Sequence, residues 1–322
     1  MTTRQLGRTD IHVSPIGLGA AQFAGKCWIS ALTPTIPQEH VDTIIKTALD
    51  GGITWFDTSE MYGGGTSERA LAGGLTHAGI TPGEVTVATK WLPLGRTARN
   101  IERTIGKRLE ALEPFPIDLH QIHLNRGGFS SVRAQMRAMA RLVQAGKIRA
   151  VGVSNFTRRQ METAHHELAK FGIPLASNEV QINLLHRKIE TNGMLDAARR
   201  LGVSLLAYSS QRQGILTGKY HADRSLIQGV HPLRRKVMGL TPEGLDRSQP
   251  LIDAMRDIAA EHQATVGQVA LAWLIGYYGD TVIPIAGASK PHHAEEAAGA
   301  LKVQLSADEL ERLAGLSQHV TG

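Results

Sequence analysis

The stretch ITWFDTSEMYGGGTSERALAGGLTH, residues 53–77, carries an apolar strand, a glycine-rich polar loop and an amphipathic helix in succession. Residues 53–56 form the short apolar run of a buried strand, and residues 67–77 have the spacing of a helix, which Ser67 is expected to cap. Asp57 and Tyr62 follow the strand closely, beside three consecutive glycines at 63–65 that allow a sharp turn. The succession of strand, loop and helix in this stretch predicts the fold, because the same succession recurs along the chain.

Short apolar runs rich in β-branched residues alternate with longer helical segments through the whole sequence. The expected strands are residues 16–19, 53–56, 85–89, 119–124, 148–153, 177–180, 203–208 and 281–285. The expected helices are residues 38–50, 67–77, 97–113, 130–145, 157–170, 191–201, 249–278, 292–300 and 306–313. Parallel strands need long crossovers, and eight such units most simply close into a (β/α)8 TIM barrel. We therefore expect one barrel domain over residues 1–322.

An open doubly wound sheet is the competing architecture. Against it, residues 17–22 read GLGAAQ and lack the third glycine of a dinucleotide-binding fingerprint. Residues 5–13 are expected to form an amino-terminal hairpin that plugs the bottom of the barrel. Two long connections, residues 20–37 and 209–248, are expected at the carboxyl face, where barrel enzymes have their active sites.

The composition indicates a soluble globular protein. Hydrophobic residues make up 42% and charged residues 20% of the 322 residues. No apolar run is long enough to span a bilayer, and the first residues lack the apolar segment of a signal peptide, so no membrane partner is expected. Cys27 is the only cysteine, so no internal disulfide can form, and we expect a cytoplasmic location.

The formal net charge of +6 admits either nucleic acid or a phosphorylated small molecule as a ligand. Basic residues are scattered, with one dense cluster at residues 234–236. Aromatic residues total only 5%, and none forms a stacking platform among the basic ones. The pattern therefore argues against nucleic acid. No oligomeric state follows from the residues.

Four polar residues lie where predicted strands end: Asp57, Tyr62, Lys90 and His123. Each has an ordinary structural explanation when taken singly: a turn former, a half-buried aromatic, a solvated strand end and a satisfied core histidine. The carboxyl ends of parallel strands meet at one rim of a barrel, so the four side chains are expected to converge. Their shared placement favours a catalytic site over four separate structural roles.

The same residues resemble the catalytic signature of the aldo-keto reductase superfamily. The resemblance begins with residues 57–63, 88–90 and 118–123, and it covers nearly the whole chain in order. It continues through residues 146–156, 178–183, 207–209, 214–220 and 287–290. It implies a barrel that binds NADPH without a Rossmann domain and reduces aldehydes or ketones reversibly, acting on a small-molecule carbonyl or alcohol substrate. It implies no metal site.

The resemblance assigns Tyr62 as the proton donor to the carbonyl oxygen. A free phenol has a pKa of about 10. A lysine ammonium roughly 4 Å away would favour the phenolate by about 4 kcal/mol at an effective dielectric constant of about 20, although burial opposes this effect. Lys90 is expected to supply that charge, Asp57 to pair with Lys90, and His123 to orient the carbonyl.

For the nicotinamide end of the cofactor, the resemblance implies that Tyr208 stacks on the ring. It implies that Ser154, Asn155 and Gln181 bind the carboxamide. Gly19 would let the first rim loop approach the cofactor closely.

The remaining cofactor contacts implied by the resemblance lie near the phosphates and the adenine. They are Ser209, Leu216 and Lys219 at the pyrophosphate, Ser289 and Lys290 at the 2′-phosphate, and Glu296 at the adenine. This chain departs from the family in having His293 where a basic residue is frequent. Because a neutral histidine attracts phosphate less than arginine does, NADH is a second candidate cofactor. Basic groups of the long loop, namely Arg212, Arg224 and residues 234–236, are expected to compensate if that loop folds over the cofactor.

Two other functions remain open at this stage. The superfamily includes potassium-channel β subunits, so the chain is alternatively an NADPH-binding regulatory subunit. A barrel aldolase would use Lys90 as a Schiff-base nucleophile, which requires a lysine of depressed pKa. Phe23, Trp28 and Trp91 form either an apolar wall of the substrate pocket or local packing, and Asn125 and Arg126 are candidate polar contacts.

Overall fold

The structure is a computed structural model that describes residues 2–25, 36–232, 235 and 239–321. Four residues discussed above, Cys27, Trp28, Arg234 and Lys236, lie outside the described residues.

Eight parallel strands close into a barrel, so the predicted (β/α)8 fold is confirmed. The barrel order is β10-β3-β4-β5-β6-β7-β8-β9. The strands are β3 (Gly17–Gly19), β4 (Trp55–Asp57), β5 (Thr86–Trp91), β6 (Leu119–Ile122), β7 (Ala150–Ser154), β8 (Leu175–Gln181), β9 (Ser204–Tyr208) and β10 (Val282–Gly287). Each differs from its predicted range by two residues or fewer at either end.

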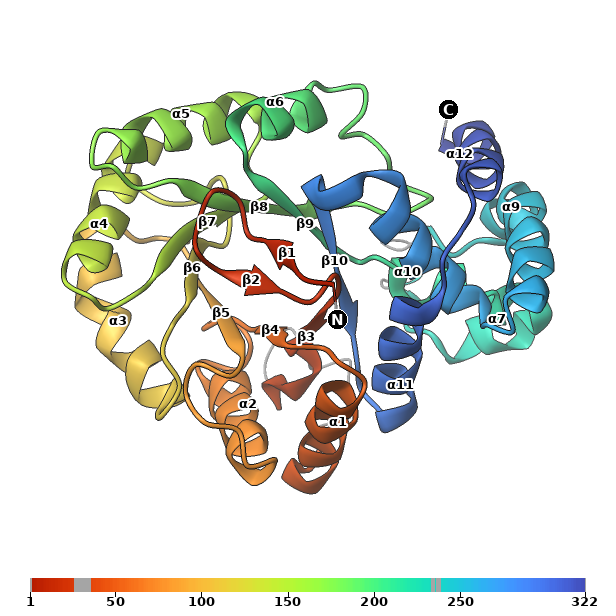
Figure 1. The fold of residues 1–322 in the computed structure, drawn as a ribbon, viewed down its shortest axis with the longest axis horizontal. Helices are drawn as coiled ribbons and strands as arrows, with labels where there is room; N and C mark the ends of the chain where they lie inside the picture. The colour runs from red at the N-terminus through yellow and green to blue at the C-terminus, as the bar shows by residue number, and fades with distance from the viewer. Residues whose placement is uncertain (1, 26–35, 233–234, 236–238, 322) are drawn as a thin grey trace.

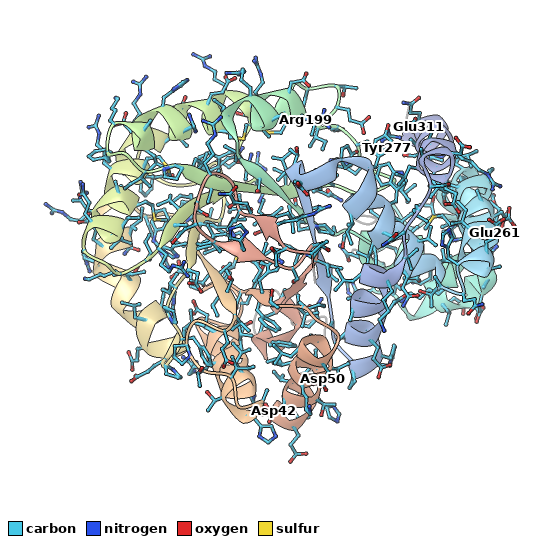
Figure 2. All side chains as sticks on the ribbon, in the orientation of Figure 1. Asp42, Asp50, Arg199, Glu261, Tyr277 and Glu311 are labelled. Carbon is cyan, nitrogen blue, oxygen red and sulfur yellow. The ribbon has the colours of Figure 1, made fainter. Side chains whose placement is uncertain are left out.

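A ring of helices surrounds the barrel (Figure 1). The longer ones are α1 (Gln38–Asp50), α2 (Thr66–His77), α3 (Arg99–Leu112), α4 (Val132–Gln144), α5 (Arg158–Ala169), α6 (Met194–Leu201), α9 (Pro242–Glu261), α10 (Val266–Tyr277), α11 (Pro291–Gly299) and α12 (Ala307–Thr321). Short helical segments are η1 (Ala21–Ala24), η2 (Arg212–Thr217), α7 (Lys219–Ala222), η3 (Arg224–Gly229), η4 (Gly279–Thr281) and η5 (Ala300–Lys302). Figure 2 shows the charged side chains of Asp42, Arg199 and Glu261 on the outer side of this ring.

The single helix predicted over residues 249–278 is wrong. The structure has two helices there, α9 and α10, separated at residues 262–265. Gln263 has a positive φ of 51°, which ends α9. Thr265 then caps α10 in a reciprocal capping box with Gln268.

The expected hairpin is present as β1 (Arg4–Gln5) and β2 (His12–Val13), which pair antiparallel. In Figure 1 it lies across one end of the barrel. Its side chains Leu6, Ile11 and Val13 belong to a buried apolar cluster with barrel residues that include Trp55 and Leu119. Since Trp55 and Leu119 are the first residues of β4 and β6, the hairpin closes the amino-terminal end of the barrel and leaves the carboxyl rim free.

The glycine run after β4 makes the turn that the sequence predicts. Gly63, Gly64 and Gly65 have φ angles of 77°, 64° and 105°, a region that residues with a Cβ rarely adopt. A Cβ on Gly63 would also lie 2.1 Å from the carbonyl oxygen of Ala24. Ser67 does not cap α2 as expected: it lies inside the helix, fully buried, and donates to the carbonyl oxygen of Ala20 at 2.6 Å.

Within the described residues, no helix combines the length and the apolar composition that a bilayer crossing requires.

Candidate active site

The four predicted catalytic residues come together at the carboxyl rim of the barrel. Asp57 is the last residue of β4, Lys90 lies near the end of β5, and His123 directly follows β6. These three strands are neighbours in the barrel, with Asp57 paired to Ala88 and Lys90 paired to Gln121. Tyr62 lies on the loop between β4 and α2. Asp57, Tyr62 and His123 line one cavity of about 710 Å³, and Lys90 is fully buried beside it.

The cavity runs from these catalytic candidates to the start of α11. Its volume lies within the range usual for small-molecule sites. The lining residues are Gly19, Ala21, Gln22, Asp57, Tyr62, His123, Ser154, Asn155, Glu179, Tyr208, Ser209, Ser210, Gln211, Gln213, Gly214, Thr217, Lys219, Ile285, Gly287, Ser289, His292, His293 and Glu296.

Lys90 is held by two carboxylates and a carbonyl group. Its Nζ donates to Asp57 Oδ2 and to the carbonyl oxygen of Thr58 at 3.1 Å, and it lies 3.3 Å from Glu179 Oε2. Burial alone would lower the pKa of Lys90, but Asp57 and Glu179 raise it above its ordinary value. This is the opposite of the depressed pKa that a Schiff-base lysine requires, so the surroundings of Lys90 argue against the aldolase alternative.

Asp57 shares its surroundings with Glu179. Burial and then the charge of Glu179 raise the pKa of Asp57 to about 7, although Lys90 acts in the opposite direction. Gln121 bridges the two carboxylates, because its Nε2 donates to Glu179 Oε2 at 2.9 Å and lies 3.3 Å from Asp57 Oδ1. The cluster of Asp57, Lys90, Gln121 and Glu179 is thus one connected polar unit inside the barrel.

Tyr62 lies between the lysine and the histidine. Lys90 Nζ is 5.5 Å from the centre of its ring, and the ring of His123 meets it edge-on at a centroid distance of 5.7 Å. Tyr62 retains some exposure because it lines the cavity, yet burial raises its pKa to about 12. Lys90 lowers this pKa, as expected, but burial together with Asp57 and Glu179 outweighs it. The expected net shift towards phenolate is therefore not what this arrangement produces.

His123 is neutral in the physiological pH range. Burial and then the charge of Lys90 lower its pKa to about 3. Its Nδ1 is hydrogen-bonded to the hydroxyl of Ser59 at 2.8 Å, so its Nε2 is the ring nitrogen left to meet a ligand.

The cavity wall beyond His123 combines hydrogen bonding with strained backbone. Tyr208 donates to Asn155 Oδ1 at 3.0 Å, and Asn155 Nδ2 donates to the carbonyl oxygen of His123 at 3.2 Å. Asn155, Ser209 and Gln213 have positive φ angles of 60°, 55° and 52°, although none is glycine. Strained backbone conformations of this kind are more frequent at functional sites, and all three residues line this cavity.

The other end of the cavity suits an anionic, polar ligand. Lys219, Ser289 and His293 supply donors beside the first turn of α11. Burial, followed by the charges of His292, Lys219 and Lys290, lowers the pKa of His293, so this histidine is neutral without a ligand.

The cavity also has the features of a nucleotide-cofactor cradle. Gln22 Oε1 is buried on the cavity wall and has no hydrogen-bond partner among the described residues. A Cβ on Gly19 would lie 3.1 Å from Ile285 Cγ2, and one on Gly287 would lie 3.3 Å from the amide of Gln22, so both glycines keep the wall open. An elongated cavity with basic groups at one end and an aromatic ring at the other fits a dinucleotide.

The predicted cofactor residues divide into two groups. Those that line the cavity are Gly19, Ser154, Asn155, Tyr208, Ser209, Lys219, Ser289 and Glu296. Those outside its lining are Gln181, Leu216 and Lys290. Gln181 lies two residues beyond Glu179 at the very end of β8, and Leu216 is fully buried in the apolar core.

Several other candidates serve packing or surface contacts. Phe23 and Trp91 are buried in the main core and do not line the cavity. Asn125 bonds to Gln160, and Arg126 is exposed.

The described arginines of the long loop that were expected to compensate His293 do not line the cavity either. Arg224 pairs with Asp246 on the surface, and Arg235 donates to the carbonyl oxygen of Val230 at 2.6 Å. Arg212 is half-buried outside the lining. Compensation of His293 is therefore not seen for Arg212, Arg224 and Arg235, while the contribution of Arg234 and Lys236, outside the described residues, stays a prediction.

Three site residues were missed in the sequence: Ser59, Gln121 and Glu179. For Gln121 and Glu179 the available signal was the alternation of strand residues: Ser177 Oγ donates to Gln121 Oε1 at 3.0 Å inside the barrel, and Glu179 follows Ser177 by two positions. Ser59 lies on the loop after β4, where no such alternation applies.

A closed parallel barrel with an acid–base cluster in a cavity at its carboxyl rim is the architecture of a barrel enzyme. Residues 15–318 match the family described as the Aldo/keto reductase family, and the chain belongs to it. It is therefore an oxidoreductase of the NAD(P)H-dependent kind.

Individual relatives are similar along nearly their whole length. An uncharacterised oxidoreductase of Mycobacterium bovis is 34% identical over 307 residues, covering 94% of this chain and 88% of that protein. An aldo-keto reductase of Schizosaccharomyces pombe whose name includes NADP(+) is 28% identical over 316 residues, covering 94% of this chain and 88% of that one. Among solved structures, the glycerol dehydrogenase from Gluconobacter oxydans has a TM-score of 0.82 and 26% identity, covering 99% of this chain and 96% of that chain.

Proposed function

We propose that this protein catalyses the reversible reduction of an aldehyde or ketone to an alcohol with NADPH, and that Tyr62 donates the proton. The observation that carries the proposal is the placement of Tyr62 in one cavity with His123 and beside the buried Lys90. The preserved pair of Lys90 and Asp57 supports an active acid–base site. A cytoplasmic location and a single domain over residues 1–322 stay predictions from the sequence.

NADPH supplies the hydride in the forward direction. Tyr62, with its pKa of about 12, is fully protonated at neutral pH and so is ready to act as an acid. The alkoxide that develops from a carbonyl is far more basic than a phenolate, so proton transfer from the tyrosine hydroxyl is downhill. The ammonium of Lys90 stabilises the phenolate that remains.

His123 positions the carbonyl in this scheme. The ring is neutral, because its pKa is about 3, and its Nε2 is free of the contact that holds Nδ1. A neutral imidazole with a proton on Nε2 donates to the carbonyl oxygen without adding a charge that would compete with Tyr62 for the proton.

The cofactor residues of the proposal are those that line the cavity. Tyr208 would stack on the nicotinamide, and Ser154 and Asn155 would bind its carboxamide, since they lie on the wall next to His123. Lys219 and Ser289 would meet the phosphates near α11, with Glu296 at the adenine. Gln181, Leu216 and Lys290 keep their assignments from the resemblance alone. The relative whose name includes NADP(+) supports NADPH, with NADH as the second candidate.

The test is a panel of aldehydes, ketones and alcohols assayed with NADPH and NADH, for the native protein, Tyr62→Phe and Tyr277→Phe. Tyr277 is the matched control, because it lies on α10 outside the cavity lining (Figure 2). We expect cofactor-dependent turnover that falls by at least about a hundredfold in Tyr62→Phe and stays near native in the control. Equal turnover by native protein and Tyr62→Phe would overturn the assigned donor. Cofactor binding without any turnover would instead support a regulatory subunit.

A further inference from the structure

Two carboxylates, not one, surround the buried lysine of this site. Asp57 comes from β4 and Glu179 from β8, on the far side of β5, β6 and β7 in the barrel order. Both approach Lys90 Nζ, and the amide of Gln121 donates to Glu179 at 2.9 Å. Side-chain exposures are 0% for Lys90, 4% for Asp57 and 6% for Glu179. With both carboxylates ionised, the cluster carries a formal charge of −1, whereas a lysine and one carboxylate would be neutral.

Glu179 also lies on the strand between the two residues proposed to hold the nicotinamide ring, Ser154 and Tyr208. Its strand, β8, lies between β7, which ends in Ser154, and β9, which ends in Tyr208. Glu179 is paired with Ser154 in the β7–β8 ladder, and Tyr208 is paired with Gln181 in the β8–β9 ladder. Ser154, Glu179 and Tyr208 all line the cavity. A ring that lies on Tyr208 and binds Ser154 therefore lies against the carboxylate of Glu179.

We propose that Glu179 makes this site favour the oxidised form of the nicotinamide cofactor over the reduced form. The inference rests on the proposed function, because it needs a nicotinamide ring between Ser154 and Tyr208. The oxidised ring carries a positive charge and the reduced ring carries none, while the rest of the cofactor is the same in both forms. A fixed negative charge on the cavity wall thus stabilises one form selectively.

The effect has a defined size and direction. At the effective dielectric constant of about 20 that suits protein sites, one unit charge within several ångströms changes the affinity for the charged ring by at least about tenfold. Above pH 7, where a pKa of about 7 leaves Asp57 mostly ionised, Lys90 balances only one of the two carboxylates, so the net field at the ring is negative. The consequence is that a mixed pool of the two forms loads this site with more of the oxidised cofactor than a site that lacks the second carboxylate.

The experiment is a calorimetric titration of the native protein and Glu179→Gln with NADP⁺ and with NADPH at about pH 8.5, where Asp57 is ionised in the native protein. Glutamine keeps the shape of the side chain and an oxygen that accepts from Gln121, and it removes only the charge. We expect the ratio of the two dissociation constants to shift about tenfold towards NADPH in the variant. Glu179→Asp keeps the charge, and we expect its ratio to remain close to the native one.

Glu296→Gln is the matched control, since it removes one carboxylate from the same cavity at its other end, on α11. It should change the affinity for both cofactor forms equally. Thermal denaturation checks that each variant is folded. If Glu179→Gln shows no cooperative transition, Glu179→Met is a second variant that removes the charge.

The outcomes separate this inference from the proposed function. Binding of both forms by the native protein, with a ratio that charge removal at Glu179 leaves unchanged, overturns the role of Glu179 and leaves the reductase assignment standing. Failure of the native protein to bind either form overturns both. If Glu296→Gln changed the ratio of the two dissociation constants as much as Glu179→Gln does, the inference would also be contradicted. The selectivity would then not depend on a carboxylate next to the nicotinamide ring.

Discussion

The hydroxyl of Ser59 favours one of the two neutral tautomers of His123. Ser59 Oγ accepts from the backbone N–H of Met61 at 3.1 Å and is fully buried. Its own hydrogen is satisfied when it donates to His123 Nδ1, 2.8 Å away. A neutral histidine that accepts at Nδ1 carries its proton on Nε2, the nitrogen that the proposed mechanism uses.

Ser59→Ala should therefore reduce kcat/KM for carbonyl reduction by about two- to tenfold, the equivalent of one ordinary hydrogen bond. Nitrogen chemical shifts of the His123 ring, assigned with His123→Asn, should show the loss of a single Nε2–H tautomer. The pH profile should not move, because the pKa of about 3 keeps the ring neutral throughout the assay range. An unchanged tautomer together with an unchanged kcat/KM would contradict this role.

The four candidate catalytic side chains could be predicted from the sequence to lie together, but their full electrostatic setting could not. Asp57, Lys90 and His123 could be predicted because each ends a recognisable strand. Glu179 and Gln181 lie two apart on one strand face, so alternation cannot decide which one is deep enough to meet Lys90.

The pKa of Tyr62 escaped prediction for a related reason. The sequence predicts the nearby lysine, whereas the depth of burial and the second carboxylate, which outweigh Lys90, depend on how strands distant in sequence are arranged.

At the scale of elements, the loop that carries Tyr62 is tied to α3 by buried charges. Glu60, two residues before Tyr62, accepts from Arg108 Nη1 at 2.7 Å and from Arg96 Nη1 at 2.6 Å. Arg108 Nε also lies 2.9 Å from Glu68 Oε2 in α2, although the two atoms are not aligned for a hydrogen bond. One arginine thus compensates carboxylates on both sides of the glycine turn.

Arg108→Met should lower the free energy of unfolding by about 3–5 kcal/mol, because it removes the buried ion pair of Glu68 and leaves Glu60 with the more exposed Arg96. Arg96→Met is the matched control. Its side chain is 36% exposed against 8% for Arg108, and it meets only Glu60, so we expect a loss of about 1 kcal/mol or less. Urea unfolding measures both values, and equal losses would show that Arg108 has no special role.

A helix or strand could be predicted where the spacing of its apolar residues and the residues that mark its two ends indicated the same range. The long stretch after residue 249 failed this condition, because apolar spacing continues through α9 and α10 while the break depends on Gln263 in a positive-φ conformation. The connection at residues 209–248 was expected as a loop, and it contains η2, α7, η3 and the first residues of α9. Short helical turns have too few residues to show a period.

On the scale of the whole molecule, stability and chemistry occupy opposite ends of the barrel. The eight-strand rhythm was enough to predict this architecture, because parallel strands joined by helices have few ways to close. The hairpin packs Leu6, Ile11 and Val13 against the amino-terminal ends of the strands, and the candidate catalytic residues lie at the carboxyl rim.

This separation predicts that damage at the hairpin affects folding but not catalysis. Ile11 is 2% exposed within the inner cluster, and truncation of such a side chain to alanine removes buried apolar surface and leaves a cavity. Ile11→Ala should lower the free energy of unfolding by about 2–5 kcal/mol in urea titrations. Measured well below the thermal transition, its kcat/KM should stay within about twofold of native, since no group at the rim changes. Tyr62→Phe should show the reverse pattern, with near-native unfolding and lost turnover. A parallel loss of activity in fully folded Ile11→Ala would mean that the plug shapes the rim through the barrel, and the two ends could no longer be treated as independent.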